Sequence, residues 1–199
     1  MNPVQEITKE MAGIADRDFL LAKAKEFHGD LCAGIVLGTR MTVIGMRELG
    51  MDPKIRNRDL IVYVEIDRCI ADAIQAITGC SLGHRSLKYR PYGKFAATYV
   101  NIKNGDAVRV SVVEKKRTDK TGPEAMKEAV KILLEAPEAD LFRLKKVRVD
   151  IPDGDMPGMP KRRARCSRCN EMIVDDKEVT VDGGVLCGNC ANGSYYREL

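Results

Sequence analysis

The sequence predicts an α+β fold: an antiparallel or mixed sheet with packed helices, followed by a small cysteine-bearing module. Three observations support this. Segments of helical period and segments of strand character follow one another without a regular strand–helix–strand repeat. An Asn-Gly pair at residues 104–105 lies between two strand-like runs. Four of the seven cysteines lie in two close pairs near the C-terminus. A chain of 199 residues suffices for one medium core and one small module.

Composition narrows the class of protein. Hydrophobic residues make up 44% of the chain and charged residues 31%, which is typical of a folded domain and excludes a charge-rich disordered chain. No apolar run reaches the roughly 18 residues that a membrane span needs, and no signal-peptide pattern opens the chain. We therefore expect a cytoplasmic protein with no membrane contact. The net charge of +4 does not indicate a dedicated nucleic-acid binder.

Two helices are expected first. Apolar residues recur every three to four positions over residues 18–27, which predicts a short amphipathic helix. Residues 31–49 are apolar almost all round, as in a helix at the centre of the fold or at a subunit interface. Gly34 and Gly38 lie one turn apart within it. Because glycine inside a helix costs about 1 kcal/mol relative to alanine, we expect another element to pack closely on that face.

The sheet follows. Residues 60–66 are rich in β-branched and aromatic side chains and predict a buried strand, and residues 68–78 predict a helix that Gly79 ends. The runs 95–102 and 107–113 predict a β-hairpin.

The remaining elements of the core are a helix and a strand. The segment Thr121-Gly-Pro-Glu124 matches a capping box and predicts a helix to about residue 135. Residues 147–151 predict one more strand. Residues 1–151 would then form the core, and the proline- and glycine-rich, basic stretch 152–165 a linker to a module at 166–199.

The C-terminal cysteines predict a zinc finger. Two Cys-x-x-Cys pairs with this separation match a four-thiolate Zn²⁺ site, because each short turn can present two sulfurs to one tetrahedral ion. A redox dithiol pair is the alternative, but a module with so few apolar residues needs a metal in order to fold. We expect a hairpin between 173–174 and 178–181, a turn at 182–184 and a helix over 191–199, the order of a treble clef. The predicted zinc ligands are Cys166, Cys169, Cys187 and Cys190.

A second group of reactive side chains lies in the core. His28 and Cys32 are four residues apart, which puts them on one face if the helix is continuous there. Cys69 begins a predicted helix, where the helix dipole favours a thiolate. Taken singly, each of these residues is also compatible with ordinary packing or capping.

Several blocks of sequence together resemble the FmdE family, named after the E component of formylmethanofuran dehydrogenase. These blocks are Phe27-His-Gly-Asp-Leu-Cys-Ala-Gly34, Asp67-Arg-Cys-Ile-Ala-Asp-Ala-Ile-Gln75, Thr78-Gly-Cys-Ser-Leu-Gly83 and Tyr92-Gly-Lys-Phe-Ala-Ala97, with Gly38-Thr-Arg40. The resemblance implies an α+β core, a homodimer, and a cleft that gathers the histidine and cysteines. Carried onto this chain, the motif positions are His28, Cys32, Cys69 and Cys80, with Asp72, Gln75 and Lys94 nearby. The chain departs from the family pattern at Asp30, where a second histidine is common, and at Ala33, where proline is common.

These observations predict a metal-binding protein with Zn²⁺ in the finger and a candidate second metal at His28, Cys32 and Cys69. Three protein ligands would leave a position for water or substrate, so the same residues are the candidate catalytic groups. The family resemblance implies an accessory subunit of an oxidoreductase, not catalytic alone for that reaction. The alternative is a regulatory or adaptor protein whose finger binds a partner protein or, with weaker support from the basic run 161–165, nucleic acid. A third alternative is a structural dimer with packed cysteines.

Overall fold

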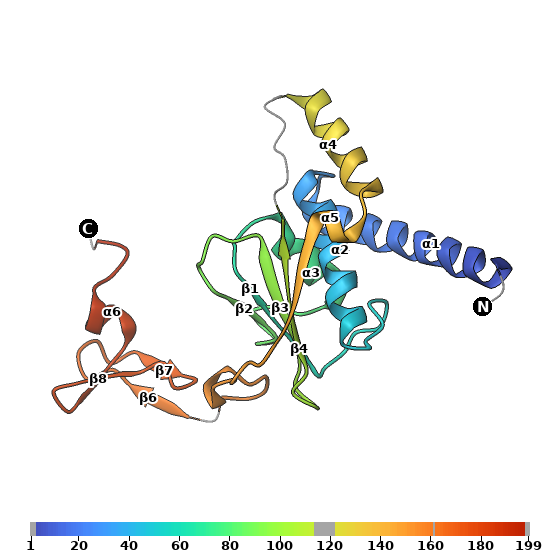
Figure 1. Ribbon diagram of the computed structural model, residues 1–199. Helices are drawn as coiled ribbons and strands as arrows, with labels where there is room; N and C mark the ends of the chain where they lie inside the picture. The colour runs from blue at the N-terminus through green and yellow to red at the C-terminus, as the bar shows by residue number, and fades with distance from the viewer. Residues whose placement is uncertain (1–2, 114–121, 161, 198–199) are drawn as a thin grey trace. The chain divides into compact units, whose positions relative to one another are not determined.

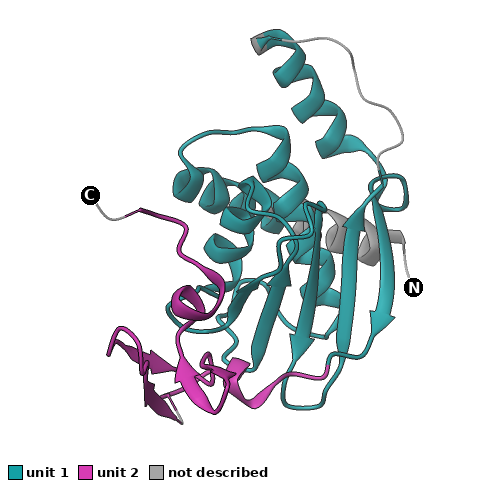
Figure 2. Ribbon diagram, turned by 90° about the vertical axis from the view of Figure 1, so that its left-hand side faces the viewer, with its two compact units in different colours: residues 1–149 teal, residues 150–199 magenta. Residues whose placement is uncertain are grey.

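A computed structural model describes residues 3–113, 122–160 and 162–197. The chain divides into two compact units, Met1–Val149 and Asp150–Leu199 (Figure 2).

The first unit combines helices with a five-stranded mixed sheet, as the sequence predicts (Figure 1). Its helices are α1 (Pro3–His28), α2 (Ala33–Glu48), α3 (Cys69–Thr78), α4 (Pro123–Glu135) and the short α5 (Glu138–Leu141). Its strands are β1 (Leu60–Val64), β2 (Leu87–Tyr89), β3 (Ala96–Asn101), β4 (Ala107–Val112) and β5 (Phe142–Val147).

The sheet has the order β2-β1-β3-β4-β5. The β1–β2 pair is parallel and the other three pairs are antiparallel. The predicted hairpin is present as β3 and β4, with Tyr99 opposite Val108. The parallel strand β2 was not predicted, because three residues are too few to show an alternating pattern.

One face of the sheet forms the core with α2 and α3. Val62 and Tyr99 from the sheet belong to one buried cluster with Ile44 of α2 and Ile70 of α3. Tyr99 is fully buried, and its hydroxyl lies 3.1 Å from Thr42 Oγ1. The helices α1, α2 and α3 also contact one another, so the start of α3 lies against the first turns of α2.

The C-terminal region of the first unit differs from prediction at two places. The strand expected at 147–151 is instead β5, Phe142–Val147, because its residues 143–146 are exposed charged and apolar side chains that hide the strand pattern. Helix α4 begins at Pro123 with Gly122 as N-cap and no side-chain cap, so the predicted capping box does not form its start. Thr121 lies outside the described residues.

The second unit contains two small hairpins and one short helix. Strands β6 (Arg163–Arg165) and β7 (Met172–Val174) pair, as do β8 (Val179–Val181) and β9 (Gly184–Leu186). The 3₁₀ helix η1 covers Asp153–Asp155 and α6 covers Gly188–Asn192. Some of the stretch predicted as a linker thus belongs to the secondary structure of this unit.

Two predictions for the finger were wrong. The segment 173–174 pairs with 164–163 rather than with 178–181, because Asp175 and Asp176 both have positive φ and turn the chain away. The predicted turn at 182–184 is present, and Asp182 and Gly183, both with positive φ, connect β8 to β9.

The final helix also differs: α6 begins just after Cys187 and ends at Gly193, whose φ is +93°. The last residues of the helix predicted at 191–199, 198 and 199, lie outside the described residues. Within the described ranges of the chain, no helix has the length and apolar character that crossing a membrane requires.

Candidate metal centres

The structure brings together two groups of side chains that can hold a metal ion. One contains the four finger cysteines and the other His28, Cys32 and Cys69. Within each group the ligand atoms all lie within 4.8 Å of one another. The two groups belong to different units of the chain.

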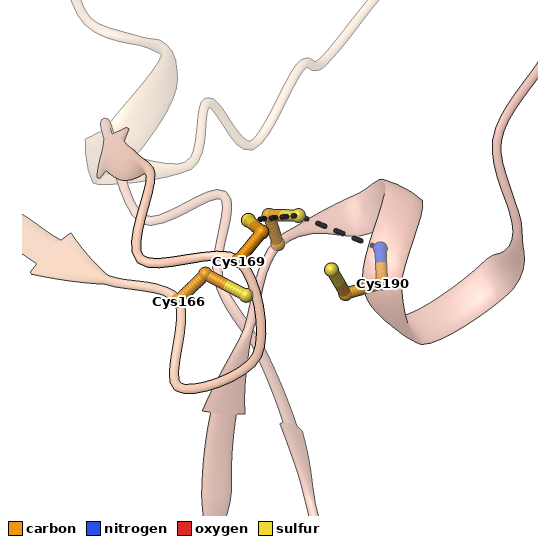
Figure 3. Close-up of side chains that lie close together, drawn as sticks. Cys166, Cys169 and Cys190 are labelled. Atoms are coloured by element: carbon orange, nitrogen blue, oxygen red, sulfur yellow. Dashed lines mark hydrogen bonds between the residues drawn. The ribbon is translucent and has the colours of Figure 1, made fainter. Parts of the chain in front are cut away.

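In the finger, the first cysteine pair lies in the turn that joins β6 to β7. The N–H of Asn170, whose φ is +64°, donates to the carbonyl of Cys166 over 2.9 Å and closes this turn. The second pair lies at the start of α6, where the Cys187 sulfur accepts the N–H of Cys190 over 3.4 Å. In Figure 3 the labelled sulfurs of Cys166, Cys169 and Cys190 converge on one small region.

The geometry of the finger fits a tetrahedral metal–thiolate site. Zn–S bonds of about 2.3 Å place two sulfurs about 3.8 Å apart at a tetrahedral ion. Cys169 Sγ and Cys187 Sγ are 3.8 Å apart. The four sulfur donors therefore fit zinc in number, type and spacing.

The finger thiols differ in their readiness to ionise. Backbone N–H groups of Cys169 and Cys187 lower the pKa of the Cys166 thiol to about 6. Burial, together with the neighbouring sulfurs, raises the pKa of Cys190 to about 12. Without a cation, the four thiols would not all be thiolates at neutral pH, and a divalent ion supplies the missing positive charge.

The core group comes from three helix ends. His28 is the last residue of α1, Cys32 is the N-cap of α2, and Cys69 is the first residue of α3. The helix is not continuous from His28 to Cys32, because Gly29 has a φ of +97° and ends α1. The two side chains still meet: Cys32 Sγ lies 3.9 Å from His28 Nε2.

Asp72 orients the histidine. Its Oδ2 lies 2.7 Å from Nδ1 of His28. When the neutral ring donates Nδ1–H to this carboxylate, Nε2 is left as a free acceptor on the side of Cys32. The sequence placed Asp72 nearby without this contact. The signal was its position in the first turn of α3, three residues after Cys69.

The expected thiolate character of Cys69 is wrong for the metal-free chain. Burial and the hydrogen bond with Cys32 raise the pKa of the Cys69 thiol, despite its place at a helix start. Two sulfurs that share one small space cannot both ionise cheaply without a cation. The helix dipole, which is felt mainly within the first turn, is the weaker effect here.

Gly34 allows the two sulfurs to approach. A Cβ at this position would lie 2.8 Å from Cys69 Cβ, 3.1 Å from Cys69 Sγ and 3.7 Å from Cys32 Sγ. Gly38 has the same effect at the next turn of α2, where a Cβ would lie 2.8 Å from the Cα of Ile70. The predicted close packing on these glycines is therefore the contact with α3.

Other residues named from the family motif are not members of this group. Cys80 is only 3% exposed, and its thiol donates to the Leu60 carbonyl over 3.6 Å. Gln75 is half-buried one turn after Asp72, and Lys94 is exposed with its Nζ 5.9 Å from the ring centre of Tyr92. Among the described residues, only His28, Cys32 and Cys69 form a group of metal-ligating side chains in the first unit.

Comparison with known proteins places this geometry in a family. The family model described as "FmdE, Molybdenum formylmethanofuran dehydrogenase operon" matches residues 27–143, more than half of the chain. The chain belongs to the FmdE family. The matched region includes all three residues of the core group and Asp72.

Two relatives of this FmdE-family chain differ in how far the likeness extends. A probable S-adenosyl-L-methionine-binding protein from Archaeoglobus fulgidus is 34% identical over 200 residues, which are 89% of this chain and 53% of that protein. The chain thus spans about half the length of this relative. The FmdE-like protein of a tungsten formylmethanofuran dehydrogenase, from Syntrophus aciditrophicus, matches with a TM-score of 0.61 and 23% identity. The match covers 91% of this chain and 95% of that protein, and it shows a shared fold.

The two departures from the FmdE pattern lie beside the core group rather than in it. Asp30 is exposed in the connection between α1 and α2 and is not a member of the group. Ala33 is the first residue of α2, the position at which a helix accepts proline most readily. The start of α2 therefore forms with either residue.

Arginines of the basic run make contacts within the finger unit. Arg162 forms an ion pair of 2.9 Å with Glu178, and Arg165 donates to the Asn170 carbonyl over 3.0 Å. Arg168 donates to the carbonyl of Cys190, beside the cysteine group. Lys161 lies outside the described residues. These contacts give the arginines a role in the unit itself.

Proposed function

We propose that this FmdE-family protein binds two metal ions, a structural zinc in a treble-clef finger and a second, reactive metal in the core. The observation that carries the second site is the convergence of His28, Cys32 and Cys69 from three separate helix ends. Residues so far apart in sequence meet without any apolar packing need for a histidine there. The bound histidine is further supported by Asp72, as in carboxylate–histidine–metal arrangements.

The core site has the composition of a catalytic rather than a structural centre. Three protein ligands leave one position of a tetrahedral ion for water or substrate, whereas the four finger thiolates leave none. All three core residues are half-buried, so solvent can reach the group from one side. Two thiolates would neutralise a divalent ion, and the metal would supply Lewis-acid chemistry at the fourth position.

Metal content tests the core site. The reduced full chain, loaded with Zn²⁺ and desalted, should carry about two ions, and Cys32→Ser should carry about one. Cys80→Ala is the matched control, because Cys80 is buried outside the group, and it should retain about two. A wild-type chain that carries one ion, all of which is lost when the finger cysteines are replaced, would contradict the core site.

A role as an accessory, homodimeric subunit of an oxidoreductase follows from the family. The family model and the Syntrophus protein both carry the name of formylmethanofuran dehydrogenase, and that name supports assembly with other subunits. Co-purification of the tagged chain from its own cells, followed by mass spectrometry, tests this. Recovery of molybdenum- or tungsten-enzyme subunits would support the assignment, and recovery of the chain alone would contradict it.

S-adenosyl-L-methionine binding is a second candidate, favoured by the 34% identity to the Archaeoglobus protein. The matched region is about half of that protein, so this chain alone is the right sample for equilibrium dialysis with labelled S-adenosyl-L-methionine. Saturable retention of the label would support this candidate, and its absence would contradict it. The adaptor alternative has less support, because the finger arginines contact their own unit.

A further inference from the structure

The two core cysteines form a pair in addition to contributing to a metal site. Their sulfurs lie within 4.8 Å of each other. A disulfide has an S–S bond of about 2.05 Å, so the sulfurs would have to approach by less than about 3 Å. Rotation about the Cα–Cβ bonds moves a sulfur by this order of distance without a change in the backbone.

Access to oxidants separates this pair from the third core thiol. Cys32 and Cys69 are half-buried, whereas Cys80 is 3% exposed and donates to the Leu60 carbonyl. The four finger thiols would be held by their metal. In the first unit, the described cysteines thus comprise one accessible pair and one inaccessible thiol.

Both sulfurs lie at helix starts that fix the backbone on either side. Cys32 Sγ accepts the N–H of Ile35 over 3.4 Å as the cap of α2, and Cys69 opens α3. Gly34 lies between them, with its missing side chain facing both sulfurs. The packing of α2 on α3 therefore holds the pair together whether or not a metal is bound.

We propose that Cys32 and Cys69 are a reversible redox switch of the core site. In the reduced state the two thiols, with His28, bind the metal. In the oxidised state they form a disulfide, which removes two of the three ligands and releases the ion. The metal half of this proposal rests on the proposed function, but formation of the disulfide does not.

The oxidant is a low-molecular-weight disulfide such as oxidised glutathione. One core thiolate attacks a sulfur of the oxidant, forms a mixed disulfide and expels one reduced thiol. The second core thiolate then attacks the protein sulfur of the mixed disulfide and expels the second reduced thiol. The two core thiols lose two protons and two electrons in total, and the oxidant takes up both.

The experiment uses the full chain with zinc in the finger and the core metal removed by a mild chelator. After incubation with oxidised glutathione, unreduced peptides are mapped by mass spectrometry and free thiols are counted. The expected result is a linked pair of peptides containing Cys32 and Cys69, about 2 Da lighter than the reduced pair, with Cys80 still free. Dithiothreitol should then restore both thiols, and Cys32→Ser should give no linked peptide.

Co²⁺ uptake by the core is measured in parallel, with the Cys32→Ser spectrum subtracted to remove the finger signal. Uptake by the reduced chain, its loss after oxidation and its return with dithiothreitol would support the full proposal. Free thiols or unresolved mixed disulfides at Cys32 and Cys69 would overturn the switch, even if the reduced chain binds Co²⁺. A Cys32–Cys69 disulfide in a chain that takes up no core Co²⁺ would instead overturn the proposed metal site and, with it, the switch's effect on metal.

Discussion

The hydrogen bond between His28 and Asp72 determines which ring nitrogen faces the sulfurs. Nδ1 of His28 lies 2.7 Å from Asp72, and Nε2 lies 3.9 Å from Cys32 Sγ. A metal that binds Nε2 needs that nitrogen unprotonated, and the carboxylate fixes the proton on Nδ1. Asp72 also lies in the same helical turn as Cys69, so one element positions both a ligand and the partner of another.

Replacing Asp72 with asparagine should weaken the core metal site without unfolding the protein. Asparagine keeps the size of the side chain but accepts the Nδ1–H less strongly, and a lost partner of this kind typically lowers metal affinity about 10–100-fold. Competition with a coloured chelator measures the affinity of the second ion. Asp67→Asn, a change of the same type just before α3, is the control and should change affinity much less. Equal affinities for Asp72→Asn and wild type would contradict the orienting role.

Gly34→Ala should disturb the same site from the other side. The new Cβ would lie 2.8 Å from Cys69 Cβ and 3.1 Å from its Sγ, so α3 or the Cys69 side chain must move. We expect a loss of about 1–3 kcal/mol in the free energy of unfolding and weaker binding of the core metal. Urea titration and the chelator competition measure the two effects. Gly83→Ala, whose Cβ would meet nothing within 4 Å, should change neither.

At the scale of elements, predictability followed the strength of local patterns. The strand at 60–64, the helix at 69–78 and the hairpin of β3 and β4 carry patterns of their own and were predicted closely. Pairing inside the finger was not, because strands of three residues have no period and their partners are chosen by turn residues with positive φ. The core group was anticipated from spacing and family motif, whereas its actual geometry depends on the break at Gly29.

The contact of α2 with α3 sets the position of the whole core group, and Gly38 tests it. An alanine there would place Cβ 2.8 Å from the backbone Cα of Ile70 and 2.7 Å from Ala73 Cβ. Because backbone cannot rotate aside as a side chain does, Gly38→Ala should lower the free energy of unfolding by about 1–3 kcal/mol. Urea unfolding followed by circular dichroism measures this, with Gly83→Ala as control. A stability within about 0.5 kcal/mol of wild type, the usual range for a surface substitution, would show that the two helices separate easily.

At the scale of the whole molecule, the two units rely on different sources of stability. The first unit has an extended buried core of apolar residues from the sheet and helices. The second has three buried residues, Cys166, Ile173 and Leu186, one of which is itself a metal ligand. Apolar burial on this scale cannot offset the conformational entropy of a unit of this length, so its fold depends on the metal.

Removal of metal should therefore unfold the second unit and leave the first folded. We expect a strong zinc chelator to abolish amide-exchange protection in 163–192 while β1, β3 and α3 keep theirs, because their hydrogen bonds are closed by the apolar core. Hydrogen-exchange mass spectrometry with and without chelator measures both regions in one sample, and metal analysis confirms that the ion is gone. Cys187→Ser should mimic the chelator in the second unit, since it removes one of four ligands, whereas Cys32→Ser should leave that unit protected. Protection that survives in 163–192 after complete loss of zinc would mean that the apolar contacts of the finger suffice, and that its cysteines serve a purpose other than folding.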